Sequence, residues 1–567
     1  MFLKKIYEKK SDRTFLNIVR SRRVNGKNIH ETVQSVGYLD ELTALYNDPV
    51  AHFKEIARNM TIAEKEAQAS ITLKFTVADT LTSGQSNRKN IGYFPLSKLY
   101  TELQISKFMT NRQRNLNISY NLDSIFRLLV FSRILFPDSK KKTYENRERF
   151  FERFHFSLDD VYRSLSLFHR YADDLKAFMH KQVCQRYDRK TDLVFYDVTN
   201  YYFEIEQPDE LRKRGVSKEH RPNPIVQMGL LMDQKGLPVT YELFSGNTND
   251  CETLMPVLHK VRQDFDIGRF IVVADRGLNT SNNTAMALAK GDGYIYGQSI
   301  LKASEAMKAY CLKEDGYNFY KDSESGFKIK SRIMPRTIRL ENAAGKMIEV
   351  AVDEKQIFFY SEKYARRTRA KRQEALEKAV QLIASPSKYL SAAQQGVKKY
   401  IQGLQVDSET GEILNTQQAL FLDEEKIAQE AQYDGYYAVV TSELDMPDTK
   451  VMDHYKGLWQ IEESFCLTKS DLEARPVFVS TQDHINAHFL TCFVALLLLR
   501  LVQLKTDHKY PAGQLLDAMR NANGTLLDNG YYVFDYYNEC LKHLGHCFNL
   551  DFSKKFLNKS VIQTMKK

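Results

Sequence analysis

The chain has 567 residues, of which 43% are hydrophobic, 12% are aromatic and 27% are charged. This composition excludes wholesale disorder, and the length exceeds what one hydrophobic core supports, so we expect roughly three to five domains or subdomains. The formal net charge of +10 suits a polyanionic partner such as nucleic acid, although a solvated basic surface gives the same total.

Cysteine usage and hydropathy bear on the compartment. Seven cysteines are scattered without a C-x-x-C pair, which argues against a disulfide framework and fits a reducing environment. The first residues contain no apolar stretch of signal-peptide length. The longest apolar run, Phe489 to Leu504, contains Arg500 and is short for a bilayer span, so a buried helix is expected. We therefore expect a soluble, cytoplasmic protein with no membrane partner.

The first forty residues predict a β-hairpin. Two β-prone runs flank Asn25-Gly26, a dipeptide that favours a tight two-residue turn. Arg20, Arg22 and Arg23 cluster near that turn. Surface hairpins commonly carry charge, and the same arginines could contact DNA phosphates, so both interpretations stay open.

Residues 97–190 have the periodicity of helices, with apolar residues recurring at spacings of three and four. Asn121 and Ser157 stand where helix N-caps are expected, and Pro137 is expected to end the first of these helices. Helical arrays of this kind often bind DNA, although most helical bundles do not.

From Asp192 onward the pattern changes to buried strands, in the order β-β-β-α-β-α-β. Antiparallel strands followed by parallel crossovers predict an α/β ribonuclease-H-like core. A long segment with a highly charged helix interrupts this core, and a sequence pattern typical of β-strands returns near Tyr433. The predicted domains are an N-terminal β-containing region expected to bind DNA (1–96), a helical domain (97–190), the first part of the core (191–299), an insertion domain (300–432), and the second part of the core with the C-terminal helices (433–567).

Two aspartates have positions that suggest chemistry. Asp197 lies within the apolar strand "LVFYDVT", and Asp275 ends the strand "RFIVVAD". A carboxylate in such a place is costly unless it is paired or bound to a cation, and Mg²⁺ binds carboxylate oxygens. A single strand-end Asp is more often a turn or cap residue, but two on strands that are adjacent in this fold favour a metal site.

A third carboxylate comes from "DHYKGLWQIEESFCLTKSDLEARPVF", predicted to be helical. Tyr455, Glu462 and Lys469 are spaced by seven residues, nearly two helical turns, and so project from one face. Glu463 points about 100° away, given ~3.6 residues per turn. A solvent-facing glutamate on an amphipathic helix produces the same spacing. Trp459, one turn before Glu462, fits either core packing or stacking on a base.

These motifs together resemble the DDE transposases of bacterial insertion sequences, most closely the subgroup with a Tyr-Arg-Glu-Lys signature and an insertion before the catalytic Glu. Tyr455, Glu462 and Lys469 match that signature in register, whereas Leu458 occupies the Arg position. The segments "FYDVTNYYFE", "FIVVADRGLNT" and "LWQIEESF" with "ARPVF" are similar to the blocks around the three acidic residues. The similarity extends over most of the chain.

The resemblance implies a site in which Asp197, Asp275 and Glu462 are catalytic and hold two Mg²⁺ (or Mn²⁺) ions. It implies cutting of DNA at the element ends to leave a 3′-hydroxyl, and attack of that hydroxyl on target DNA. Tyr455 and Lys469 would contact phosphates near the scissile bond. The implied partners are the terminal inverted repeats and the target DNA, with a homodimer assembled on DNA.

The charged helix of the insertion could also bind DNA. A solvated basic face is the default for such a sequence, but in a DNA-processing enzyme it could grip element-end or target DNA. Two other functions stay open: a DNA-binding protein derived from a transposase but without activity, and a metal-dependent nuclease on the same fold. The candidate DNA-binding residues of this helix are Arg366, Arg367, Arg369, Lys371 and Arg372.

Overall fold

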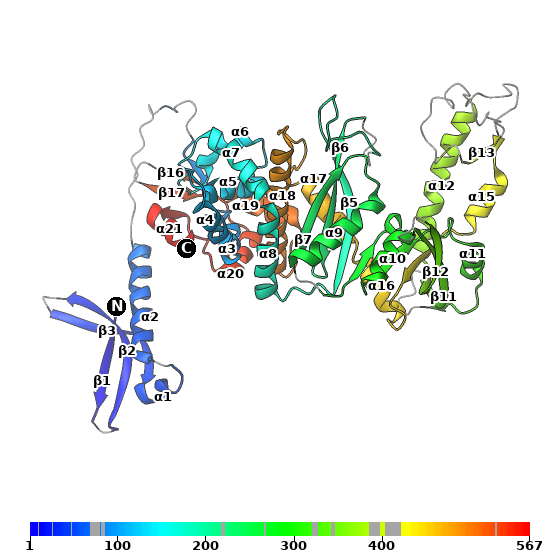
Figure 1. The fold of residues 1–567 in the computed structure, drawn as a ribbon. Helices are drawn as coiled ribbons and strands as arrows, with labels where there is room; N and C mark the ends of the chain where they lie inside the picture. The colour runs from blue at the N-terminus through cyan, green and yellow to red at the C-terminus, as the bar shows by residue number, and fades with distance from the viewer. Residues whose placement is uncertain are drawn as a thin grey trace. The chain divides into compact units, whose positions relative to one another are not determined.

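The chain divides into two compact units, residues 1–85 and residues 86–567, each with its own hydrophobic core (Figure 1). The computed structural model describes residues 1–9, 11–24, 27–46, 48–68, 80, 86–216, 222–265, 268–319, 327–341, 346–384, 397, 399–402, 421–527 and 530–566.

The first unit is a three-stranded antiparallel sheet with two helices. The strands pair in the order β1-β2-β3, and Leu16, Leu42 and Phe53 form the small core. The strands expected on either side of Asn25-Gly26 are present as β2 and β3, while the turn itself lies outside the described residues. The elements are β1 (Phe2–Glu8), β2 (Arg13–Val24), β3 (Lys27–Tyr38), α1 (Leu39–Thr43) and α2 (Pro49–Gln68).

The second unit begins with the predicted helices. The side chain of Asn121 caps its helix by accepting a hydrogen bond from the Ser124 amide, and Ser157 forms a capping box with Asp160, so both predicted N-caps are confirmed. The first of these capped helices ends two residues before Pro137. The helices are α3 (Phe94–Glu102), α4 (Ile105–Gln113), α5 (Leu122–Leu135), α6 (Lys140–Glu145), α7 (Leu158–Arg170) and α8 (Ala172–Tyr187).

The C-terminal part of the chain returns to this bundle. α18 packs against α3, α5 and α7, and the last two helices pack against α3. A small sheet of order β18-β17-β16-β4 joins residues 88–90 to residues 523–525. The elements are α18 (Gln482–Lys505), α19 (Ala512–Asn521), α20 (Glu539–Phe548), α21 (Lys559–Lys566), β4 (Arg88–Asn90), β16 (Asn523–Leu526), β17 (Tyr531–Phe534) and β18 (Phe556–Asn558).

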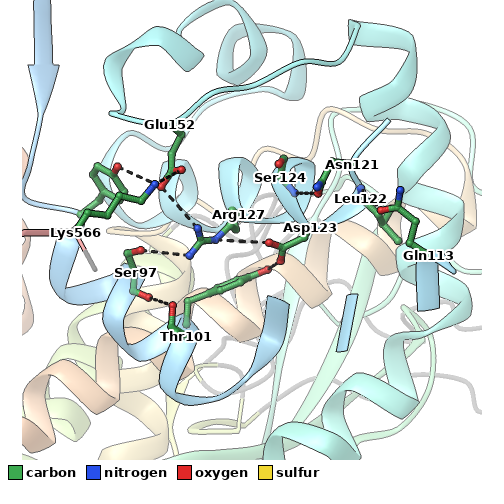
Figure 2. A network of polar contacts seen from close by, with 12 residues as sticks. Ser97, Thr101, Gln113, Asn121, Leu122, Asp123, Ser124, Arg127, Glu152 and Lys566 are labelled. Carbon is green, nitrogen blue, oxygen red and sulfur yellow. Dashed lines mark hydrogen bonds and ion pairs between the residues drawn. The ribbon is translucent and has the colours of Figure 1, made fainter. Parts of the chain in front are cut away.

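A polar network centred on Arg127 ties these segments together (Figure 2). Arg127 of α5 donates to the Ser97 hydroxyl of α3 at 3.3 Å and lies 3.7 Å from the carboxylate of Glu152. Lys566, near the end of α21, pairs with the same carboxylate. Asp123, one turn before Arg127, lies 3.9 Å from the Arg127 guanidinium. The first and last helices of the second unit are therefore connected by polar as well as apolar contacts.

The apolar run that ends at Leu504 is a core helix. In the described part of the chain, α18 is the one helix long and apolar enough to cross a bilayer, and 94% of its most apolar window is buried within the protein. The expected buried helix is confirmed.

A nine-stranded mixed sheet forms the centre of the second unit, in the order β10-β11-β12-β15-β9-β8-β5-β6-β7. The first three core strands are antiparallel neighbours, and β8 and β9 run parallel to β5. The sheet order third-second-first-fourth-fifth confirms the predicted ribonuclease-H-like core. Its strands are β5 (Leu193–Tyr202), β6 (Ile225–Asp233), β7 (Pro238–Ser245), β8 (Ile271–Ala274) and β9 (Gly293–Gln298).

The segment predicted as an insertion extends this sheet before adding helices. β12 pairs with β15, which pairs with β9, so the added strands continue the core without a break. Figure 1 shows α12 beside α15 at the end of the unit that carries β11 and β12. The elements are α11 (Glu305–Leu312), β10 (Asn318–Phe319), β11 (Lys328–Glu341), β12 (Met347–Tyr360), α12 (Glu362–Ile383), β13 (Ile401–Gln402), β14 (Phe421–Leu422), α15 (Glu424–Ala431) and β15 (Tyr436–Thr441).

Helices cover both faces of the core strands. Val194, Tyr196 and Val198 of β5 pack in the core that includes α9. Leu193 and Phe195 point the other way, into the core that includes α17 and α18. The covering elements are α9 (Asp250–Phe265), η2 (Arg276–Leu278), α10 (Ser281–Ala289), α16 (Asp448–Lys456) and α17 (Trp459–Lys469).

Candidate active site

The two predicted aspartates lie at matching positions on neighbouring parallel strands. The last residues paired between β5 and β8 are Tyr196 and Ala274. Asp197 follows Tyr196 directly, and Asp275 follows Ala274 directly. Asp275 keeps an extended backbone, with φ −71° and ψ 165°. Continuing the register by one residue sets Asp197 beside Asp275, because neighbouring strands lie about 4.8 Å apart.

Strand alternation puts both aspartates on the same face of the sheet. Phe195 and Val273, two residues before Asp197 and Asp275 respectively, pack in the core that α17 covers. Side chains two residues apart in a strand point to the same face. The aspartates are thus directed toward the side of the sheet that carries Glu462.

The stretch predicted as one helix is two helices that meet at Gly457 and Leu458. Bonds of the i→i+3 type tighten the junction, including Leu458 N–H to Tyr455 O at 3.2 Å. The junction packs closely on the sheet, because a Cβ on Gly457 would lie 2.4 Å from Cζ of Phe195. Glycine at this position lets the chain approach β5 closely. Sequence periodicity could not reveal a contact with a residue so far away in the chain.

The neighbouring glutamates have different environments. Glu463 forms a 2.9 Å ion pair with Arg500 of α18, whose guanidinium is buried and also donates to Ser464 Oγ and to the Gln460 carbonyl. The Glu462 carboxylate is exposed and forms no hydrogen bond or ion pair with the described residues. Arg500 therefore fixes α17 through one glutamate and leaves the other facing outward.

A cavity of about 1030 Å³ opens beside these carboxylates. Asp275, Tyr455 and Glu462 line it together, whereas Asp197 and Lys469 are not among its lining residues. The Lys469 ammonium instead lies 5.4 Å from the ring centroid of Tyr201 on β5. The structure thus brings two of the three predicted carboxylates and the signature tyrosine to one cavity.

Tyr455 connects the helix to the second aspartate. Its hydroxyl donates to Asp275 Oδ1 at 3.3 Å. Burial and the Asp275 charge raise the pKa of Tyr455 well above its ordinary value. The phenol therefore stays protonated at physiological pH and donates its hydrogen bond to the Asp275 carboxylate.

Carboxylate oxygens are donors that suit Mg²⁺ or Mn²⁺, and Asp197, Asp275 and Glu462 supply them from three elements on one side of the sheet. Within the described ranges, no group of three Asp, Glu, His or Cys side chains is assembled closely enough to hold a metal ion. The donor set fits a divalent cation in chemistry, while the Asp275 carboxylate is held by Tyr455.

The basic residues of α12 separate into two groups. Arg366 pairs with Glu362, and Arg372 binds both carboxylate oxygens of Asp434, which Arg369 also approaches at 3.9 Å. The other group has no ion pair or hydrogen bond with the described residues and lines the cavity. It consists of Lys363, Arg367 and Lys371, which follow one another at intervals of four residues along α12.

Lys363 was absent from the predicted residues, although the spacing of four along Lys363, Arg367 and Lys371 could have indicated one helix face. Arg276, directly after Asp275, also lines the cavity and was not predicted. These positions carry positive charge toward the acidic residues from two different elements.

Other predicted contacts lie elsewhere. Arg20 forms a 2.7 Å ion pair with Glu64 of α2, and the side chains of Arg22 and Arg23 lie outside the described residues. Trp459 is 59% exposed, so it is not a core residue. Leu458, at the position of the signature Arg, is 9% exposed and packs in the core.

Two family models match this chain. A family model described as "Transposase DDE domain" matches residues 203–498, more than half of the chain. The chain belongs to the DDE transposases of bacterial insertion sequences. A second model, described as the N-terminal domain of IS1634 family transposases, matches residues 3–70 of this transposase. The matched DDE domain contains Asp275 and Glu462 and begins just after Asp197.

Solved transposase structures are only distantly similar. A piggyBac transposase synaptic complex with hairpin DNA is 7% identical, with a TM-score of 0.28, and the match covers 81% of this chain and 75% of that one. A Mos1 transposase paired-end complex with a left transposon end is 10% identical, with a TM-score of 0.13 and coverage of 41% and 65%. No curated protein matches the transposase.

We predict that Arg500→Ala lowers the free energy of unfolding by about 3 kcal/mol, because it removes one partner of a largely buried ion pair. The loss is at the low end for such pairs, since the Glu463 side chain is 35% exposed and water can solvate it. Urea denaturation followed by circular dichroism measures the change. Lys378→Ala, which breaks an exposed pair with Glu374, is the control and should cost less than about 1 kcal/mol. Equal losses in the two variants would contradict the assigned role of Arg500.

We also predict that Gly457→Ala is destabilising by about 1–3 kcal/mol, since the added methyl group overlaps the buried Phe195 ring. Phe195→Leu should relieve part of this loss in the double variant. Gly513→Ala in α19 is the matched control, because a Cβ there meets nothing within 4 Å. Thermal melting of the four proteins tests the contact; an unchanged melting temperature for Gly457→Ala would disprove it.

Proposed function

We propose that this transposase cuts DNA at the ends of its insertion sequence and joins the resulting 3′-hydroxyl to target DNA, with Asp197, Asp275 and Glu462 as the catalytic carboxylates. The observation that carries the proposal is the convergence of Asp275 and Glu462 on a cavity that Arg276, Lys363, Arg367 and Lys371 also line. These four cations form no ion pair with the described residues, whereas the other charged residues of the lining, Lys399 with Glu430 and Arg372 with Asp434, are paired with one another. A strongly anionic substrate would pair with the basic side chains of the cavity and react beside its carboxylates.

The proposed reaction has two displacements at phosphorus. In the first, a water oxygen bonds to the scissile phosphorus and the bond to the 3′ oxygen breaks, so the leaving oxygen takes a proton and becomes a 3′-hydroxyl. In the second, that hydroxyl oxygen bonds to a target phosphorus and displaces the target's own 3′ oxygen. Both steps exchange one oxygen for another, so one site serves both without a covalent enzyme intermediate.

The three carboxylates would hold two Mg²⁺ or Mn²⁺ ions, which when bound supply Lewis-acid stabilisation and lower the pKa of a water molecule. The protein's own groups prepare the site. Tyr455 orients the Asp275 carboxylate by its hydrogen bond, and Arg500 holds the Glu462 helix through Glu463. Tyr201 donates to or accepts from Thr468 at 2.9 Å, which joins β5 to the same helix.

We further propose that Lys363, Arg367 and Lys371 bind the phosphate backbone of the DNA that enters the cavity. Their spacing of four residues places them along one face of α12, with successive residues about 6 Å apart along the helix axis. Arg366, Arg369 and Arg372 contribute less, because carboxylates already compensate their charges. A homodimer in which each protomer holds one element end would supply the two sites that paired ends need.

The catalytic assignment predicts that Asp197→Asn, Asp275→Asn and Glu462→Gln each lower strand cutting by about 10²–10³-fold or more, while binding to end DNA persists. The substrate is a duplex with the inverted sequence that flanks the coding gene, incubated with Mg²⁺ or Mn²⁺. Glu425→Gln, which changes an exposed carboxylate of α15 outside the cavity, is the control and should keep cutting. Full cutting by any of the first three variants would remove that residue from the site.

The same assay separates the alternative functions. A wild-type protein that binds the ends but cuts nothing with either metal would be an inactive DNA-binding derivative. Cut products without joined products, when target DNA is present, would indicate a nuclease. Joined products support the proposed function.

For the α12 face, replacing Lys363, Arg367 and Lys371 with alanine should reduce the salt dependence of duplex binding. Each phosphate contact contributes about 0.9 to the slope of log K against log salt concentration, so the slope should fall by about 2–3. Fluorescence anisotropy between 50 and 300 mM salt, roughly the range in which such slopes are measured, provides the measurement. The control variant replaces Arg366, Arg369 and Lys378, which removes the same charge from the same helix and should change the slope by less than about one. Equal changes in both variants would contradict the assignment to the cavity-lining face.

A further inference from the structure

The transposase lacks the arginine of the Tyr-Arg-Glu-Lys signature, and the structure explains why Leu458 does not replace it. Leu458 precedes α17, is 9% exposed and packs in the apolar core. It presents no charge to the cavity that Asp275 and Glu462 line. A phosphate bound there needs its cation from another position.

Arg276 is the cavity-lining cation that is nearest in sequence to Asp275. It follows Asp275, begins η2 and is exposed, and it lines the cavity together with Tyr455 and Glu462. Its guanidinium forms no ion pair or hydrogen bond with any residue that the structure describes. Two other arginines of this region differ, since Arg336 pairs with the buried Glu354 and Arg269 pairs with Glu443.

The backbone beneath Arg276 is held firmly. Asn279, three residues later, donates to the Gly297 carbonyl at 3.2 Å and to the Gln298 side chain at 2.8 Å. Arg336 of β11 donates to the Asn279 side chain at 2.8 Å. A Cβ on Gly297 would lie 3.0 Å from the Arg276 amide nitrogen and 2.4 Å from the Tyr455 hydroxyl, so the loop lies directly against β9. A fixed backbone with an exposed side chain is suited to holding a substrate group in place.

Arg276 also acts electrostatically on Tyr455. Its positive charge opposes the rise in the pKa of the phenol that burial and Asp275 cause. The guanidinium therefore lies close enough to influence the hydroxyl that bonds to Asp275.

We propose that Arg276 contacts the scissile phosphate and supplies the positive charge that position 458 lacks. This inference rests on the proposed function. A guanidinium presents two parallel N–H donors to two phosphate oxygens, and the added negative charge on those oxygens in the transition state strengthens both hydrogen bonds. The contact makes and breaks no covalent bond, and the guanidinium keeps its proton throughout.

The test compares Arg276→Ala and Arg276→Lys with wild-type protein on end DNA in which one non-bridging oxygen of the scissile phosphate is, or is not, replaced by a methyl group. On natural DNA, Arg276→Ala should cut about 10²-fold or more slowly with little change in binding, and Arg276→Lys should recover part of the rate. On the uncharged methylphosphonate, wild-type protein and Arg276→Ala should differ by less than about 10-fold, because the contacted charge is gone. Arg269→Ala is the control and should cut natural DNA at the wild-type rate.

Four outcomes would overturn the proposal. Wild-type cutting by Arg276→Ala would show that the contact does not exist. An equal loss on both substrates, or a lowered melting temperature in Arg276→Ala and Arg276→Lys alike, would show a structural role instead. Failure of wild-type protein to cut any end DNA would refute the proposed function itself, and the Arg276 contact with it.

Discussion

The arrangement of the site depends on a guanidinium inside an apolar helix. Arg500 interrupts a run of leucines in α18, and its burial is costly unless every donor finds a partner. Glu463, Ser464 and the Gln460 carbonyl of α17 accept hydrogen bonds from it, and Gln503 of α18 accepts one more. The need to satisfy one buried charge therefore determines how α17 is rotated. Because Glu463 is turned toward α18, its neighbour Glu462 is turned toward the cavity.

The insertion serves the core in two ways. Its strands extend the central sheet from β15, and Arg336 of β11 donates a hydrogen bond to Asn279 in the loop that follows Asp275. Its long helix adds charge, but only part of that charge is available to a ligand. Asp434 neutralises Arg372, which lines the cavity as well, whereas Lys363 and Arg367 line it without an ion pair to the described residues. Pairing with carboxylates thus decides which of the basic side chains of this helix keep an uncompensated charge.

The sequence predicted the features that depend on local pattern. Strand texture and order identified the ribonuclease-H-like core, and cap residues such as Asn121 marked helix starts. A seven-residue spacing directed attention to Glu462 rather than Glu463. The close approach of Gly457 to Phe195 escaped prediction because the two residues are far apart in the chain. The available cations of α12 could not be sorted either, since the carboxylate that neutralises Arg372 lies 62 residues away.

The pairing of β4 with β16 has a consequence for how the protein is made. The side chain of Asn90 bonds to that of Asn523, 433 residues later, and α3 packs against helices from the end of the chain. The bundle that begins near residue 94 therefore cannot close until almost the whole polypeptide has left the ribosome. Contacts of such high sequence separation slow folding, so the early helices wait with apolar surface exposed while the sheet is synthesised. The C-terminal helices therefore complete a unit whose first helices are synthesised long before its last contacts can form.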